Sequence, residues 1–191
     1  NQCAGVLSPP IEELLQDRLG VELPYDIYKR QIFGYRLHAG KKEILLVGDH
    51  KGGATYAVRR VVFDRFFLSC AEKGGAEVSH SRVTAIDFPK KGRDNVFLYT
   101  EGGMLKADVV VGAFGLDDGM MSVFETATGG KYRRPGDYMH TFVVKISTDR
   151  AFIEKKLGSI IYAYLFPPGI PNLDFGAITP KGDHVIVNVA G

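Results

Sequence analysis

The sequence lacks several features that would assign a protein to a broad class at once. Its 191 residues include only two cysteines, Cys3 and Cys70, which cannot build a disulfide framework or a metal cage. There is no run of about 18 apolar residues, as a membrane span requires, and no signal-peptide core near the start. Because 24 basic and 22 acidic side chains leave a formal charge of +2 with no basic stripe, nucleic acid is excluded as the main partner. A reducing, cytoplasmic setting fits best.

What is present describes an ordinary globular protein. Hydrophobic residues make up 45% of the chain and charged residues 24%, which is enough apolar material for a sizeable core. The length suits one large domain, or one domain with part of another. The chain starts at Asn1 rather than at a methionine, and it stops at Gly191 directly after an apolar run. We therefore expect it to be the internal part of a longer protein.

Local patterns predict helices and a hairpin in the first half. A helix is expected over residues 9–19, with Ser8 as a hydroxyl cap and Gly20 at its end. Strand-like runs on either side of Gly40 predict a hairpin within residues 28–47. The clearest helix is predicted over residues 60–73 and closed by two glycines, because apolar side chains recur there with helical spacing, at Phe63, Phe66, Phe67 and Cys70.

Short strands dominate the rest of the expected structure. A meander is predicted from strand-like runs at residues 76–79, 83–88, 96–100 and 107–112, with turns at 90–95 and 101–103 between the last three. The run from Asp108 to Gly112 is continuously apolar after its acid, which predicts a strand buried on both faces of a parallel sheet. Beyond it we expect strands over residues 138–146, 159–166 and 185–189, and a capped helix over 149–157.

Three stretches of the sequence resemble a known family. Residues 1–8 (NQCAGVLS) resemble the cysteine-glycine segment that follows the second βα unit of geranylgeranyl reductases. Residues 58–78 are similar to the pattern R-x-x-F-D-x-x-L…A-x-x-x-G-A-E of flavoproteins with the para-hydroxybenzoate hydroxylase fold. Residues 107–115 resemble A-D-x-V-V-G-A-D-G of the same superfamily, although Phe114 replaces its acid. Together with residues 180–184, these motifs make the sequence resemble the geranylgeranyl reductase family of FAD-dependent oxidoreductases.

The resemblance implies an α+β fold: a partial FAD-binding three-layer domain joined to a large, mostly antiparallel sheet with flanking helices. Residues 1–25 and 52–122 would belong to the FAD-binding domain, and residues 26–51 and 123–191 to the substrate-binding sheet domain. The sequence contains no G-x-G-x-x-G after an N-terminal strand, the element that receives the pyrophosphate of FAD. We therefore expect the isolated chain to bind FAD weakly or not at all and to be inactive by itself.

The resemblance also assigns site residues. Cys3 would lie beside the isoalloxazine as a catalytic proton donor, with a small apolar residue in a turn as the alternative. Arg60 would reach the phosphates or the flavin edge of FAD, with a surface arginine at a helix start as the alternative. Gly112, Ala113 and Gly115 would let the backbone approach the cofactor, with a plain turn as the alternative.

The substrate pocket of the reductases matches less well. Its pattern Y-x-W-x-F-P corresponds here to Phe175, Ala177, Thr179 and Pro180, of which only the proline matches. Smaller side chains in place of Trp and Phe would reshape the pocket, so the substrate could differ from a geranylgeranyl chain. Residues 181–184 are also compatible with a plain hairpin turn, and no residues show the spacing of a metal site.

These features lead to one functional hypothesis and two alternatives. The chain would be part of an FAD-dependent oxidoreductase that reduces double bonds of an isoprenoid or similar apolar substrate, with electrons from NAD(P)H or ferredoxin. The alternatives are a flavin-dependent monooxygenase of the same fold, which fold alone cannot distinguish, and an isolated scaffold domain without catalysis. The expected partner is an apolar small molecule or lipid, with peripheral membrane contact left open.

Overall fold

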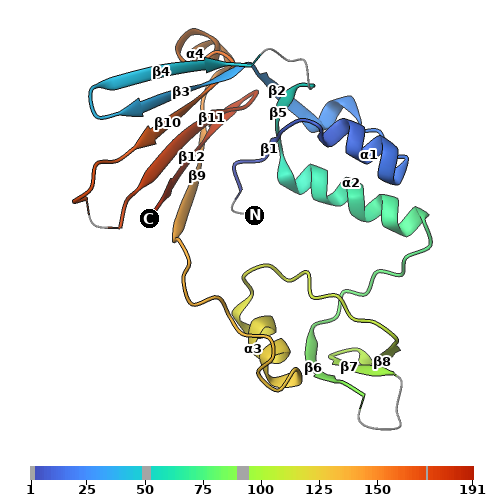
Figure 1. The fold of residues 1–191 in the computed structure, drawn as a ribbon. Helices are drawn as coiled ribbons and strands as arrows, with labels where there is room; N and C mark the ends of the chain where they lie inside the picture. Colours follow the sequence, from blue (N-terminus) through green and yellow to red (C-terminus); the bar gives the residue numbers. More distant parts are fainter. Residues whose placement is uncertain (1–2, 49–52, 90–94, 171) are drawn as a thin grey trace. The chain divides into compact units, whose positions relative to one another are not determined.

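The computed structural model describes residues 3–48, 53–89, 95–170 and 172–191, and it has the predicted α+β fold (Figure 1). The chain divides into two compact units, one formed by Asn1–Gly75 with Met139–Gly191 and the other by Ala76–Tyr138. The assignment of residues to an FAD-binding and a substrate-binding domain stays a prediction.

A six-stranded sheet is the largest element of the first unit (Figure 1). Only the β3–β10 pair is parallel and the other neighbours are antiparallel, as the prediction of a mostly antiparallel sheet requires. Gly40 makes the predicted turn with a left-handed φ of 57°, which glycine adopts without steric cost. In spatial order the strands are β4 (Lys42–Val47), β3 (Gly34–Ala39), β10 (Ile160–Leu165), β11 (Phe175–Pro180), β12 (His184–Ala190) and β9 (Thr141–Ser147).

Two local predictions in this part of the chain are confirmed. Helix α4 (Arg150–Lys156) begins at the predicted acid, because the Asp149 side chain accepts a hydrogen bond from the Phe152 amide at 2.7 Å. Residues 181–184 form a tight hairpin turn between β11 and β12, in which the Lys181 amide donates to the His184 carbonyl at 2.9 Å. Strand β9 differs slightly, since it begins at Thr141 rather than at residue 138.

A second, three-stranded sheet, in the order β1 (Val6–Leu7), β5 (Thr55–Val58) and β2 (Tyr28–Ile32), lies in the same unit. A short 3-10 helix, η1 (Tyr25–Ile27), leads into β2. Helices α1 (Ile11–Leu19) and α2 (Arg60–Lys73) pack with this sheet around a shared apolar core. That core contains Leu15, Leu23, Ile27 and Val58, against which the phenylalanines of α2 pack.

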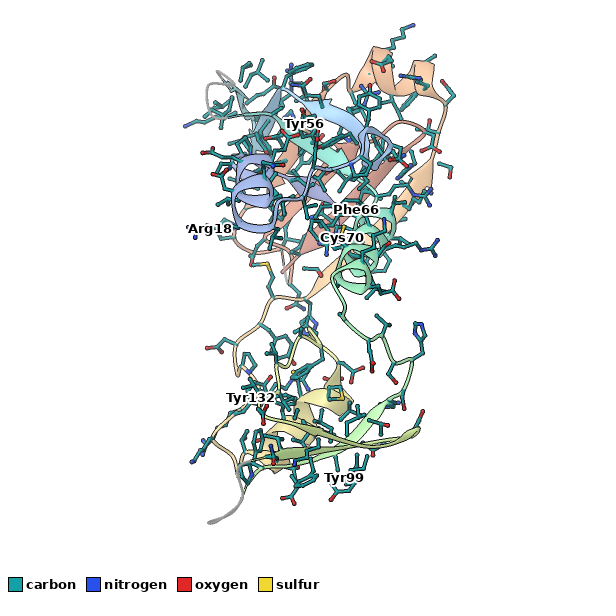
Figure 2. The ribbon with its side chains drawn as sticks, turned by 90° about the vertical axis from the view of Figure 1, so that its right-hand side faces the viewer. Arg18, Tyr56, Phe66, Cys70, Tyr99 and Tyr132 are labelled. Atoms are coloured by element: carbon teal, nitrogen blue, oxygen red, sulfur yellow. The ribbon has the colours of Figure 1, made fainter. Side chains whose placement is uncertain are left out.

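Two details of these helices differ from expectation. Ser8 does not cap α1 through its hydroxyl; Pro10 occupies the cap position, and the Ser8 carbonyl accepts from the Ile11 amide at 3.2 Å. Cys70 lies near Phe66 on α2 but is only half-buried (Figure 2). The reason is that α2 rests one face on the core and buries no residue completely.

A second core joins the small sheet to one face of the large sheet. It contains Ile32 and Ala57 from the small sheet and Ile161 and Ala177 from the large one. Because side chains alternate along a strand, the face of β11 that carries Ala177 also carries Phe175 and Thr179, whereas Pro180 lies on the opposite face.

The second unit holds a three-stranded meander and a helix, with the strands β6 (Val83–Asp87), β7 (Val96–Thr100) and β8 (Gly103–Ala107) and helix α3 (Asp118–Ala127). The first two strands were predicted, whereas β8 precedes the strand that was expected over residues 107–112. Tyr99 lies on β7, and Tyr132 follows α3 (Figure 2). Residues 76–79 do not form the expected strand, and most of the predicted turn at 90–95 lies outside the described residues.

The predicted buried strand from Asp108 to Gly112 is wrong for this structure. The segment is irregular, and Val109 and Val111 are 76% and 83% exposed. A strand needs a neighbour for its backbone hydrogen bonds, and none of the described strands pairs with these residues. Apolar composition alone therefore did not determine the conformation here.

Candidate functional site

A small cavity in the first unit lies between the start of α2 and the large sheet. Its volume is about 190 Å³. One wall comes from the N-terminal segment, the end of β5 and the first turn of α2, and the other from β9, β12 and the β11–β12 turn. The lining residues are Cys3, Val58, Arg59, Arg60, Val61, Val143, Lys145, Lys181, His184 and Ile186.

Cys3 is held in this cavity by its own loop and by α2. Its sulfur accepts a hydrogen bond from the Gly5 amide at 3.3 Å and contacts Nη1 of Arg60 at 3.6 Å. Gly5 has a left-handed φ of 63°, and a Cβ at this position would lie 2.4 Å from the Val58 carbonyl oxygen. Only glycine fits there, so the cysteine-glycine pair forms a tight turn that fixes the thiol against the helix.

Arg60 links the thiol to the first turn of α2. Its Nε and Nη2 lie 3.0 Å and 2.9 Å from Oδ1 of Asp64, one helical turn later, while Nη1 faces Cys3. The side chain of Arg60 is 37% exposed, which leaves part of the guanidinium open to solvent. The resemblance assigned Cys3 and Arg60 separately to the flavin site, and the structure brings them together.

Lys181 is a candidate site residue that was not predicted from the sequence. Although it occupies a hairpin turn, it is only 1% exposed. Its Nζ donates to the carbonyls of Ala4 at 2.5 Å, Gly5 at 2.9 Å and Val58 at 2.7 Å, which satisfies all three ammonium hydrogens. Burial lowers the pKa of this ammonium to about 8. Lysines in turns are normally solvated, so nothing in the sequence beyond the motif at residues 180–184 indicated that Lys181 is buried.

His184 provides a second buried titratable group beside the cavity. Its side chain is 4% exposed, and Nδ1 lies 2.5 Å from Oδ1 of Asp183. Burial lowers the pKa of His184, and the positive charges of Lys145 and Lys181 lower it further. The hydrogen bond to Asp183 and the charge of that carboxylate raise the pKa but do not cancel the decrease. The hydrogen bond to His184 in turn lowers the pKa of Asp183. A neutral imidazole bonded through Nδ1 keeps Nε2 available for another partner.

None of the four residues predicted for substrate binding lines the cavity, although Phe175, Ala177 and Thr179 lie on the same face of the sheet as Ile186, which does. Thr179 pairs across β12 with Ile186, which pairs across β9 with Lys145. Ala177, at 7% exposure, belongs to the core between the two sheets, and Phe175 packs against that core. Pro180 lies on the opposite face. Their contact with a substrate stays a prediction.

The predicted glycine loop lies in the other compact unit. Gly115 has a left-handed φ of 60°, and a Cβ at Gly112 would lie 2.6 Å from the Phe114 ring and 2.8 Å from the Phe124 ring. Local packing thus favours glycine at position 112, whereas a Cβ at Gly115 would meet nothing within 4 Å. Contact of Gly112, Ala113 and Gly115 with a cofactor stays a prediction.

A larger cavity, of about 780 Å³, lies in the first unit between α1 and β2 and was not anticipated from the sequence. The Tyr28 hydroxyl donates to Oε1 of Glu12 at 2.7 Å, and the Tyr28 and Tyr56 rings are 4.3 Å apart. Burial and the Glu12 carboxylate hold the pKa of Tyr28 above its ordinary value. Glu13, Glu22, Lys29 and Arg30 also line this cavity, so it carries charges of both signs.

No protein-family model and no curated protein sequence matches the chain. Solved structures do match it. A geranylgeranyl bacteriochlorophyll reductase-like protein from Thermoplasma acidophilum is 17% identical with a TM-score of 0.73, covering 100% of this chain and 46% of that one. A flavin-dependent brominase is 17% identical with a TM-score of 0.71, at 100% and 46% coverage. The protein CtdE in complex with FAD and a substrate is 14% identical with a TM-score of 0.62, at 97% and 46% coverage.

These similarities confirm the predicted fold, which this chain shares with the three structures. The chain spans less than half the length of each of the three proteins. No described helix is both long and apolar enough to cross a membrane.

Proposed function

We propose that the chain is part of an FAD-dependent oxidoreductase and that the cavity beside Cys3 and Arg60 faces the flavin. The observation that carries the proposal is the 3.6 Å contact between Cys3 and Arg60, which lie 57 positions apart in the sequence. The family resemblance assigns both residues to the flavin site, and the fold is one on which solved proteins bind flavin.

The residues that line the cavity suit a flavin dinucleotide. Its charged residues are all basic, and guanidinium donors suit the oxygen-rich edge of a flavin or its phosphates. Arg60 and Arg59, at the start of α2, would hold the cofactor. When bound, FAD would supply the hydride chemistry.

The chain's own residues would manage the proton and exclude water. Cys3 would hold a proton at Sγ and give it to the substrate carbon that does not receive hydride. The Gly5 amide and the Arg60 guanidinium would stabilise the sulfur after the proton leaves, since both donors already face it. Val58, Val61 and Val143 would keep water from this side of the cavity.

For the substrate we propose an isoprenoid or similar apolar molecule with a reducible double bond. What supports this is the resemblance of residues 1–8 to the cysteine-glycine segment of the geranylgeranyl reductases. NAD(P)H or a ferredoxin would supply the electrons, and a peripheral membrane contact would give access to a lipid substrate.

Anaerobic turnover by the full-length protein tests this function. Reduced enzyme should saturate a prenyl double bond, and Cys3→Ser should lower kcat at least about tenfold, as loss of a positioned proton donor does. Failure on several chain lengths would count against a reductase. Oxygen consumption coupled to substrate turnover would instead favour an oxygen-using flavoenzyme, a chemistry that this fold does not exclude.

A titration of FAD against the 191-residue chain separates an enzyme part from an independent scaffold. We expect weak or undetectable binding to this chain and tight binding to the full-length protein. If the full-length protein also fails to bind FAD, the chain belongs to a scaffold and the proposal is wrong.

A further inference from the structure

We propose that strand β4, at one edge of the six-stranded sheet, pairs with the β4 strand of a second copy of the same protein. The two large sheets would then continue into each other across the contact. This inference goes beyond the proposed function and does not depend on it, because β4 contributes no residue to the cavity beside Cys3.

The edge that β4 presents is open and regular. Among the described strands, β4 pairs only with β3 and stands at the end of the sheet (Figure 1). Their register runs from Gly34↔Val47 to Ala39↔Lys42 without a shift, so no bulge bends the edge. In an antiparallel pair, only alternate residues bond the neighbouring strand, and the backbone groups between them point away from it. Such an edge is a template for another strand.

The side chains of β4 are apolar on both faces of the sheet. Those of Ile44, Leu45, Leu46 and Val47 are 58%, 48%, 49% and 63% exposed. Because successive side chains alternate, Ile44 and Leu46 lie on one face and Leu45 and Val47 on the other. A partner seated on one face would leave the other face in water, whereas a strand beside β4 contacts both. Deep insertion into lipid is unfavourable, because an open sheet edge leaves backbone groups unsatisfied there.

The opposite edge of the same sheet differs in a way that singles out β4. Strand β9 carries Lys145 within the strand, and a lysine on an edge strand is a common device against unwanted pairing. In β4 the charges stand only at its first two positions, Lys42 and Glu43, and the Glu43 carboxylate is bound by Arg36 of β3. The apolar end of β4 therefore lacks the protection that β9 has.

The order of charged and apolar residues favours a second copy in antiparallel orientation. Parallel pairing in register would place each Lys42 and Glu43 beside its own counterpart, and like charges opposite each other destabilise a sheet. A twofold axis through Leu45 instead sets Leu45 against its counterpart and Ile44 against Leu46 of the second copy. The two Glu43 residues are then about 14 Å apart, four residues at ~3.4 Å each, which exceeds the screening length of about 8 Å.

This symmetry also limits the size of the assembly. Each β4 is used once in a twofold contact, so the assembly closes at two copies, whereas pairing of β4 with β9 would continue into a filament. A contact of six residues from each copy is small compared with stable interfaces. We therefore expect a weak dimer that forms as the protein concentration rises.

Sedimentation equilibrium of the full-length protein, from about 1 μM to 1 mM, tests the dimer. We expect Leu45→Lys to raise the dimer Kd at least about a hundredfold, because two ammonium groups would face each other across the axis. Ile146→Lys is the matched control, since Ile146 is also 48% exposed and lies on the other edge strand. It should change the Kd by less than about threefold, because it lies outside the contact.

Disulfide cross-linking tests the register independently. In the proposed dimer the Cα atoms of the two Leu45 residues are about 5 Å apart, within the range that a disulfide spans. Leu45→Cys should therefore cross-link two copies under mild oxidation. Val47→Cys should not, because its two Cα atoms would be about 14 Å apart. Mass spectrometry of the linked peptides distinguishes these products from any that involve Cys3 or Cys70.

Three results would overturn the proposal: a monomer over the whole concentration range, equal weakening by Leu45→Lys and Ile146→Lys, or cross-linking through Val47→Cys but not Leu45→Cys. A monomer whose outward β4 amides exchange slowly with solvent would identify a strand of the same protein as the occupant of this edge. Assemblies larger than two copies would overturn the twofold contact.

Discussion

The buried ammonium of Lys181 connects three segments of the first unit, and Lys181→Met tests how much it contributes to stability. Methionine has a similar length and no charge, so the variant removes the donors while it largely keeps the volume. Three carbonyls, those of Ala4, Gly5 and Val58, would lose the partner that they share. These groups join the Cys3 loop, the end of β5 and the β11–β12 turn.

The magnitude follows from two opposing effects. The carbonyls of Ala4 and Val58 would lose this donor at about 1–3 kcal/mol each, while the Gly5 carbonyl keeps the Val58 amide and loses about 1 kcal/mol, which gives about 5 kcal/mol together. The ammonium itself is unfavourable in this site, because burial lowers its pKa from 10.5 to about 8, which corresponds to about 3 kcal/mol. Removal of the charge offsets that amount, so Lys181→Met should destabilise the unit by about 2 kcal/mol at pH 7.

Hydrogen exchange of the Val58 amide measures this change locally, since that amide donates to the Gly5 carbonyl at 2.7 Å. Lys155→Met, an exposed lysine on α4, is the matched control and should stay within about 0.5 kcal/mol of the wild type. The folded protein holds the Lys181 proton less tightly than the unfolded chain does, so wild-type stability should rise between pH 8 and 10.5. That rise should be absent in Lys181→Met. Unchanged exchange in the variant, or the same pH slope, would refute the reasoning.

Three further changes have defined outcomes. Arg30→Ala should destabilise the first unit by about 3 kcal/mol in urea unfolding, because its buried guanidinium donates to the carbonyls of Lys181 and Gly158. Glu154→Gln alters only the exposed partner of Arg30 and should lower the stability much less. Asp149→Ala should cost about 1 kcal/mol through loss of the α4 cap, measured in the same way, and equal stability would disprove the cap. Val109→Ser should leave the stability of this chain within about 0.5 kcal/mol, since Val109 is 76% exposed, and a large loss would show that the segment is buried.

The elements that sequence predicted well are those set by local patterns. The i, i+3, i+4, i+7 spacing around Phe63 determined α2, Asp149 determined the start of α4, and Gly40 determined a hairpin. In each of these, the residues that specify the element lie within it or directly beside it, so one sequence window contains the information.

Long-range contacts decided the rest. The Lys181 ammonium reaches carbonyls more than 170 positions earlier, and no local pattern distinguishes it from a solvated lysine in a turn. The segment 108–112 shows the converse, because its apolar side chains indicate burial but cannot specify a neighbouring strand. The family resemblance assigned both Cys3 and Arg60 to the flavin site, but it did not predict that the two side chains are in contact.

The central claim is that Cys3 faces a bound flavin, and protection of its thiol tests this most directly. In the full-length protein, the rate of Cys3 alkylation by iodoacetamide would be measured by mass spectrometry with and without FAD. Cys70 is also half-buried and serves as the internal reference. The account predicts that FAD slows alkylation of Cys3 at least about tenfold and leaves Cys70 unchanged. Tight FAD binding with no protection of Cys3 would contradict it.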